Sequence, residues 1–228
     1  MPIRPRGLGP TMSTAFAALL MGASAAAAHP HVFAEATMEI VADKTGHLEK
    51  LHNAWWMDEL FSSSVIVDFD KNANGKLDKG ELAAIGKQVA SSIQEWSFYT
   101  FVHRGADLVA MKAPPTLDVV YDETRRKLRF SFDMRPSKPL DLEGGTTTFS
   151  AFDNTYFVAF DFAGASSFVA KGLPKDCHGD MSTPSPDEAA KSWMATISAL
   201  GSNDTVPEDG IKFSEVLSTK FKIACGAG

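Results

Sequence analysis

The sequence has 228 residues, of which 44% are hydrophobic and 22% are charged, a balance typical of a globular protein. Its formal charge of -6 at pH 7 argues against a nucleic-acid partner, because such proteins usually present a basic surface. A chain of this length can form one sizeable domain or two small ones.

Residues 1–28 have the pattern of a secretory signal peptide. Arg4 and Arg6 give a basic start, residues 14–23 are short and apolar, and residues 26–28 offer an A-x-A cleavage site. The alternative is an N-terminal membrane anchor, but the apolar run is well short of the ~20 residues that a span requires. We therefore expect residues 29–228 to form a single periplasmic domain with no membrane span.

Two paired strands are expected at the start of this domain. Apolar and polar residues alternate from Val32 to Ile40, the period-two pattern of a half-buried strand. Turn-forming residues follow at 44–46, and residues 47–56 predict a second strand that pairs back on the first.

The next segment, Asp70 to Glu81, fits the twelve-residue calcium loop of an EF-hand. Its positions 1, 3, 5, 9 and 12 carry the side-chain oxygens that calcium needs, namely Asp70, Asn72, Asn74, Asp78 and Glu81. Gly75 stands at the sharp turn of position 6, and Lys76 at position 7 would donate its backbone carbonyl. The alternative is an ordinary Asn/Gly-rich surface turn. With three carboxylates, we expect a structural calcium site with a Kd of ~10⁻⁴ to 10⁻³ M.

Apolar residues recur at helical spacing on both sides of this loop, which predicts a helix before it and a helix after it. Further strand patterns follow along the chain, at residues 98–103, 108–111, 117–121, 128–134, 146–152, 156–162 and 221–225. A helical stripe occupies residues 187–200. Together these patterns predict an α+β fold with a mostly antiparallel, sandwich-like β body. An EF-hand helix-loop-helix would be inserted at about residues 57–98, and a C-terminal helix would follow.

Cys177 and Cys225 are the two cysteines of the sequence. In an oxidising compartment such a pair is expected to form a disulfide, which would stabilise the fold by ~4 kcal/mol in the chain-entropy model. The alternative is a nucleophile or metal site at Cys177 and His178, for which the sequence offers no third partner.

The histidines at the expected mature N-terminus suggest a second metal site. Cleavage after Ala28 would make His29 the first residue, so that its α-amine and imidazole could both bind one metal ion. His31 can add a third nitrogen, and this set suits zinc, nickel or copper. The amino-terminal copper chelate with histidine third is excluded, because Pro30 has no amide N–H to lose. The alternative is that the two histidines stand at this terminus by chance and bind no metal. His52 is the next candidate ligand (the reserve ligand), because it lies on the strand expected to pair with the first.

Several motifs in order along the chain carry a resemblance to a known family. They are His29-Pro30-His31-Val32-Phe33, Trp56 to Ser62, the loop 70–81, Phe152 to Phe157, and Ile223 to Gly226. With these motifs the chain resembles the uncharacterised ABC-type transport system periplasmic-component family, a domain of unknown function often found beside nickel/cobalt-type metal transporters. The sequence departs from the family pattern at Met57, where an aromatic residue is commoner, and at Asn154, where a proline is usual. These two differences affect packing and the shape of a turn. The resemblance implies a periplasmic location and a membrane metal transporter as partner.

The leading hypothesis is therefore a periplasmic accessory protein of a zinc, nickel, cobalt or copper transport system that also binds calcium. No Ser/His/Asp set, phosphate-binding glycine loop or paired-carboxylate motif stands out, so we do not expect an enzyme. One alternative is a calcium-dependent interaction module that carries no transported metal. The other is a copper oxidase that uses an N-terminal histidine brace.

Overall fold

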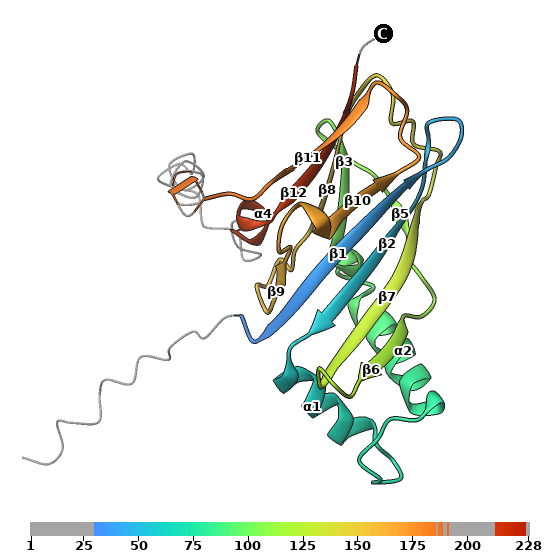
Figure 1. The fold of residues 1–228 in the computed structure, drawn as a ribbon, viewed down its shortest axis with the longest axis vertical. Helices are drawn as coiled ribbons and strands as arrows, with labels where there is room; N and C mark the ends of the chain where they lie inside the picture. Colours follow the sequence, from blue (N-terminus) through green and yellow to red (C-terminus); the bar gives the residue numbers. More distant parts are fainter. Residues whose placement is uncertain (1–29, 186, 189–190, 192–212, 227–228) are drawn as a thin grey trace, which may run out of the picture.

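The strands form two sheets. The computed structural model describes residues 30–185, 187–188, 191 and 213–226. The larger sheet contains β1 (Val32–Ala42), β2 (Leu48–Met57), β5 (Met111–Lys112), β6 (Asp118–Asp122), β7 (Lys127–Pro136), β9 (Val158–Asp161) and β10 (Phe168–Lys171). The smaller sheet contains β3 (Thr100–Arg104), β4 (Asp107–Leu108), β8 (Gly145–Ala151), β11 (Cys177–Ser182) and β12 (Lys220–Cys225). Figure 1 shows β3, β8, β11 and β12 of the smaller sheet in the upper part of the molecule, away from the helices α1 (Glu59–Phe69) and α2 (Lys79–Ile93).

The hairpin of β1 and β2 is the centre of the larger sheet and confirms the expected pairing. The two strands are antiparallel, with Ala34 opposite Met57 and Ile40 opposite Leu51. Burial alternates along β1 as the sequence pattern requires, so that one face of the strand packs in the core and the other faces solvent. The hairpin of β6 and β7 matches the strands expected at 117–121 and 128–134.

Two strands from later in the chain pair with β1 in parallel. Val32 of β1 lies opposite Val158 of β9, and Met38 lies opposite Phe168 of β10. A turn at Asp153 separates β8 from β9, since the Tyr156 N–H donates to the Asp153 carbonyl. The strands on either side of this turn nevertheless belong to different sheets, because β8 pairs with β3 and β12.

One hydrophobic core joins the two sheets. The ring of Phe168 on β10 stacks on that of Phe221 on β12, with 5.0 Å between their centroids. Phe98, which precedes β3, lies 5.7 Å from Phe132 of β7. These contacts across the sheets bury aromatic area that neither sheet could remove from water alone.

Two helices, α1 (Glu59–Phe69) and α2 (Lys79–Ile93), lie at one end of the molecule beside β6 and β7 (Figure 1). The Asp58 carboxylate begins α1 by accepting the Phe61 N–H at 2.8 Å, and it also accepts the Phe33 N–H of β1 at 2.8 Å. On α2, Gly86 permits a close approach to β6, because an added Cβ would lie 2.1 Å from the Leu117 carbonyl oxygen. A third short helix is α4 (Phe213–Leu217). No helix in these described ranges is long and apolar enough to cross a membrane.

The expected α+β class with an inserted EF-hand is wrong, because the structure is mostly β. Twelve strands and three α-helices are assigned within the described residues. The sheets are mixed and antiparallel, and the two helices near the calcium-loop sequence cover one end of the larger sheet. The strand expected at 221–225 is confirmed as β12, whereas the helix expected at 187–200 lies outside the continuously described residues.

Candidate functional site

The loop of residues 70–78 connects α1 to α2 and lies at the helical end of the molecule (Figure 1). It follows Phe69, which packs partly buried against the core, and Leu77 packs there as well. These two apolar anchors hold the ends of the loop, while the residues between Asp70 and Leu77 are exposed.

Side-chain oxygens in the first half of the loop accept hydrogen bonds from its own backbone. The two Asp70 carboxylate oxygens accept the N–H groups of Asn74 at 3.1 Å and Gly75 at 2.6 Å. The Asn72 side-chain oxygen accepts the Asn74 N–H at 3.1 Å, and that of Asn74 accepts the Lys76 N–H at 2.8 Å. Each of these oxygens keeps acceptor capacity, so the loop holds several oxygens in fixed orientations.

The backbone of the loop turns through left-handed conformations at two positions. Gly75 has a φ of 75°, and a Cβ added there would meet nothing within 4 Å. Ala73 has a φ of 54°, which is uncommon for a residue with a side chain. Glycine at position 75 therefore serves the backbone turn and leaves the space around it open.

Glu81, in the first turn of α2, is the most buried carboxylate of the loop, at 7% exposure. Its two oxygens accept the N–H groups of Lys71 and Asp78, each at 2.9 Å. Asp78 in turn accepts the N–H groups of Gly80 at 2.7 Å and Glu81 at 2.9 Å, which completes a capping box. The Glu81 carboxylate thus connects the start of the loop with the start of α2.

Residues 70–81 contain three acidic residues and three lysines, so their formal charge is zero. Asp70, Asp78 and Glu81 form no ion pair within 4.0 Å among the residues that the structure describes, and the loop's Lys76 lies 3.6 Å from Glu123 instead. No group of three or more His, Cys, Asp or Glu side chains in the described ranges is arranged to hold a metal ion. The expected ligand set also includes the amide oxygens of Asn72 and Asn74 and the Lys76 carbonyl, which are outside those residue types.

Of the two histidines in the expected N-terminal metal site, the structure describes only His31. His29 lies outside the described residues. His31 is exposed just before β1, where its N–H donates to the Phe157 carbonyl at 2.9 Å and its ring lies 5.1 Å from the Phe157 ring. The reserve ligand His52 is opposite Glu39. Since Val32 and Glu39 are seven residues apart on one strand, His52 is about 23 Å from the start of β1.

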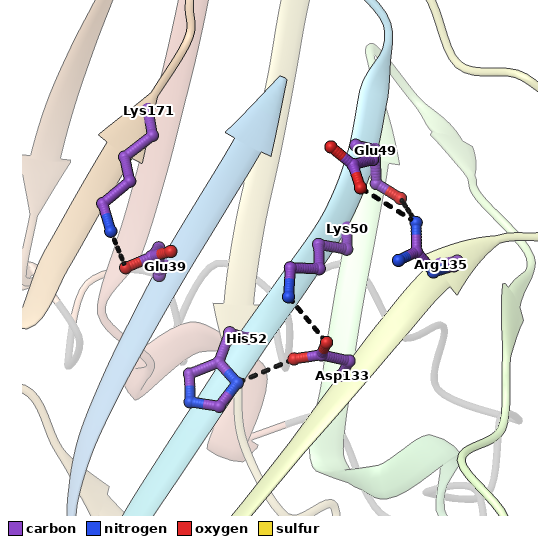
Figure 2. A network of polar contacts seen from close by, with 7 residues as sticks. All are labelled: Glu39, Glu49, Lys50, His52, Asp133, Arg135 and Lys171. Carbon is purple, nitrogen blue, oxygen red and sulfur yellow. Dashed lines mark hydrogen bonds and ion pairs between the residues drawn. The ribbon is translucent and has the colours of Figure 1, made fainter. Parts of the chain in front are cut away.

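His52 belongs to a polar network on the outer face of the larger sheet (Figure 2). Its Nδ1 lies 2.7 Å from one carboxylate oxygen of Asp133, and the Lys50 ammonium lies 2.7 Å from the other. Partial burial acts to raise the pKa of Asp133, but the hydrogen bonds from Lys50 and His52 outweigh it and hold the pKa below its ordinary value. Glu39–Lys171 and Glu49–Arg135 pairs flank this cluster.

Cys177 and Cys225 form a disulfide between adjacent strands, as expected. The two residues are directly opposite each other in the antiparallel pair of β11 and β12. Because the Cys177 sulfur is bonded to Cys225, a nucleophile or metal site at Cys177 and His178 is excluded in this oxidised form.

Sequence analysis missed the structural role of Asp58. This residue joins β1 to α1 through the two hydrogen bonds described above and so positions the helix that leads into the loop. An acidic residue directly before an apolar helical run is a recognisable N-cap signal, but its bond to β1 depends on the fold.

Comparison with known proteins agrees on a family of unknown function. A protein of Haemophilus influenzae described as an uncharacterized protein is 25% identical over 177 residues, which are 78% of this chain and 84% of the relative. The family model for the protein of unknown function DUF1007 matches residues 14–225. Neither description mentions a transporter. Because the family match spans most of its length, the chain belongs to the DUF1007 family.

Proposed function

We propose that the protein is an exported metal-binding protein whose loop of residues 70–81 takes one calcium ion. The observation that carries this proposal is the Glu81 carboxylate, which is buried and bridges the two ends of a loop that also holds Asp70 and Asp78. Backbone N–H groups of Lys71 and Asp78 already hold both oxygens of this carboxylate, so a cation could bind it without ordering a free side chain. A cation within the loop would also be attracted by the two other acids.

The oxygen chemistry of the loop favours a hard cation. Calcium prefers six to eight carboxylate, amide and carbonyl oxygens, and the loop can offer those of Asp70, Asn72, Asn74, Lys76 and Glu81. The backbone N–H groups that hold Asp70 and the two asparagines reduce the conformational entropy that ligand ordering would cost. Asp78 would contribute charge and is suited to act through a water molecule.

Export agrees with such a site. The Cys177–Cys225 disulfide fits an oxidising compartment, in which the free calcium concentration is compatible with an affinity of ~10⁻⁴ to 10⁻³ M. We extend the proposal to a periplasmic role beside a transition-metal transporter, with His31 as one ligand. The support for this extension is the family resemblance and the exposed position of His31 before β1. The distance of His52 from that position gives no support to a copper oxidase.

Calcium titration of the purified protein tests the loop. Calorimetry and thermal unfolding should report one site, with a stabilisation of ~2.7 kcal/mol when free calcium is about 100 times Kd. Asp70→Asn should abolish the effect, whereas Asp68→Asn, at an exposed position of α1, should not. An unchanged titration for Asp70→Asn would rule out the site. Analysis of bound zinc, nickel and copper separates a metal carrier from a calcium-dependent interaction module.

A further inference from the structure

An apolar cavity of about 220 Å³ lies between the larger sheet and the two helices. Its lining comes from separate elements of the chain and includes Trp55, Val89, Ser92, Tyr99, Phe157 and Phe160. The cavity is partly open to solvent, so water can lie against its apolar walls. An apolar ligand that displaces this water removes apolar surface from solvent, which favours binding.

Aromatic rings form one wall of the cavity. The Phe160 ring centroid lies 5.0 Å from that of Trp55 and 5.6 Å from that of Tyr99, and both pairs are tilted. At these distances the three rings support one another and present a rigid surface. Phe157, which also lines the cavity, is 46% exposed.

Two hydrogen-bond donors accompany this apolar lining. Trp55 is 4% exposed, and its indole N–H has no acceptor among the residues that the structure describes. An indole nitrogen is only a donor and usually finds a partner when buried. Burial, with help from the charges of Asp153 and Glu95, raises the pKa of Tyr99 to about 12, so its hydroxyl stays protonated and able to donate.

The chain adopts a costly conformation to place Tyr99 at this wall. Ser97, Phe98 and Tyr99 have φ values of 54°, 52° and 49°, and three consecutive left-handed residues with side chains are rare. Such a conformation persists only where the surrounding structure enforces it, and it is often associated with ligand sites. Here it directs Phe98 into the core, at 1% exposure, and sets Tyr99 beside Trp55.

We infer that this cavity is a binding site for a small, largely apolar molecule, of about the size of one substituted ring, that carries a hydrogen-bond acceptor. The apolar walls supply the affinity, and a donor at Trp55 or Tyr99 favours a ligand with a carbonyl or ether oxygen over a plain hydrocarbon. This function is separate from metal binding, since the cavity is lined by none of the proposed calcium or transition-metal ligands.

Acetophenone and isopropylbenzene are suitable probes, because they have the same number of non-hydrogen atoms and the same branching, with a methyl group of isopropylbenzene in place of the carbonyl oxygen. Calorimetry or NMR titration of the disulfide-bonded protein should show saturable binding of acetophenone, both in chelator and in calcium. Trp55→Phe and Tyr99→Phe each remove one donor. At least one of these substitutions should weaken the affinity for acetophenone by about fivefold, the effect expected for the loss of one hydrogen bond. The affinity for isopropylbenzene should stay nearly unchanged.

Filling the cavity gives the decisive comparison. Val89→Phe adds a ring from α2 into the space, and Ser92→Phe adds one at its exposed rim, so both should abolish binding of either probe. Ser91→Phe places the same ring on α2 outside the cavity and should leave binding intact. Val89→Phe should also raise the melting temperature. The inference is overturned if wild-type protein shows no saturable binding, or if both filled variants bind the probes as wild type does. Performing the titrations in chelator keeps this result independent of the calcium site.

Discussion

Glu81 and Lys71 are joined by a hydrogen bond of 2.9 Å between the Glu81 carboxylate and the Lys71 backbone N–H, across ten residues of sequence. The bond brings the start of the loop to the first turn of α2, while the second Glu81 oxygen accepts the Asp78 N–H. One carboxylate therefore closes the loop from both sides. Its charge is positioned by the fold itself.

Glu81→Gln should consequently have two separable effects. In chelator, the loss of the ionised capping partner should reduce the free energy of unfolding by about 1 kcal/mol, the usual value of a helix cap. In calcium the loss should be larger, because the variant cannot offer both carboxylate oxygens to the ion. We expect the calcium Kd to rise about tenfold or more, equivalent to at least ~1.4 kcal/mol of binding free energy.

Calorimetric titration and urea unfolding measure the two effects independently. Glu59→Gln is the matched control, since Glu59 is an exposed glutamate in the first turn of α1 and lies 3.8 Å from Arg126. The control should bind calcium as the wild type does. Equal calcium affinities for Glu81→Gln and Glu59→Gln would contradict the assignment of Glu81.

Reduction of the Cys177–Cys225 disulfide should destabilise the protein strongly. The bond closes a chain separation of 48 residues, for which the chain-entropy model gives ~4 kcal/mol. Urea unfolding with and without reductant measures this change. The double variant Cys177→Ala and Cys225→Ala should unfold near the reduced midpoint and be insensitive to reductant. An unchanged midpoint for the wild type in reductant would contradict a stabilising disulfide.

Many of the strand positions could be predicted from the sequence, because they depend on local patterns. The alternation from Val32 to Ile40 and the turn after it defined the hairpin of β1 and β2. The parallel pairing of β1 with β9 and β10 could not be predicted, since its partners lie more than a hundred residues away and have no signal in the intervening chain. The α+β class was wrong because α1 and α2 were interpreted as a separate helical unit, whereas most of the assigned elements are strands.

The candidate sites differ in how far the sequence could reveal them. Every proposed calcium ligand stands between Asp70 and Glu81, so the spacing alone is enough to propose the loop as a candidate site. The cavity is the opposite case, because Trp55, Val89 and Tyr99 come from separate elements and become neighbours only in the fold. Likewise, Asp133 pairs with Lys50 and His52 through strand register, across more than eighty residues.

The N-terminal histidines give a prediction that does not depend on the loop. If His29 becomes the first residue, its α-amine closes a chelate with its own imidazole, and His31 adds a ligand. Adding one alanine before His29 moves the amine away and should weaken zinc, nickel or copper binding at least as much as His31→Ala does. Calcium binding should not change. Metal titration of the three proteins measures this, and equal affinity for the extended and mature forms would contradict the brace.

Gly86→Ala tests the close approach of α2 to Leu117, the residue directly before β6. Alanine normally stabilises a helix interior by ~1 kcal/mol relative to glycine. Here the new Cβ would lie 2.1 Å from the Leu117 carbonyl oxygen, so backbone must move. We therefore expect a net destabilisation of about 1–3 kcal/mol, as for other overpacked sites. Urea unfolding gives the sign directly, and a stabilised variant would show that α2 does not pack this closely on the sheet.

Asp133 should make the outer face of the larger sheet sensitive to acid. Its pKa is lowered in the folded state, with hydrogen bonds from Lys50 and His52 outweighing the opposing effect of burial. A carboxyl group with a depressed folded pKa contributes stability that is fully present above its unfolded pKa. That contribution disappears as pH falls through the folded pKa. Because the Asp133 side chain is 40% exposed, solvent screening limits its contribution at neutral pH to about 0.2–1 kcal/mol.

Asp133→Asn should therefore lower the free energy of unfolding by this amount at pH 7, and the difference from wild type should vanish well below pH 3.8. Asp118→Asn, an exposed position on β6, is the matched control and should show little difference at either pH. Urea unfolding at both pH values distinguishes these cases. A difference for Asp133→Asn that is the same at both pH values would mean that the charge of Asp133 contributes nothing to the fold.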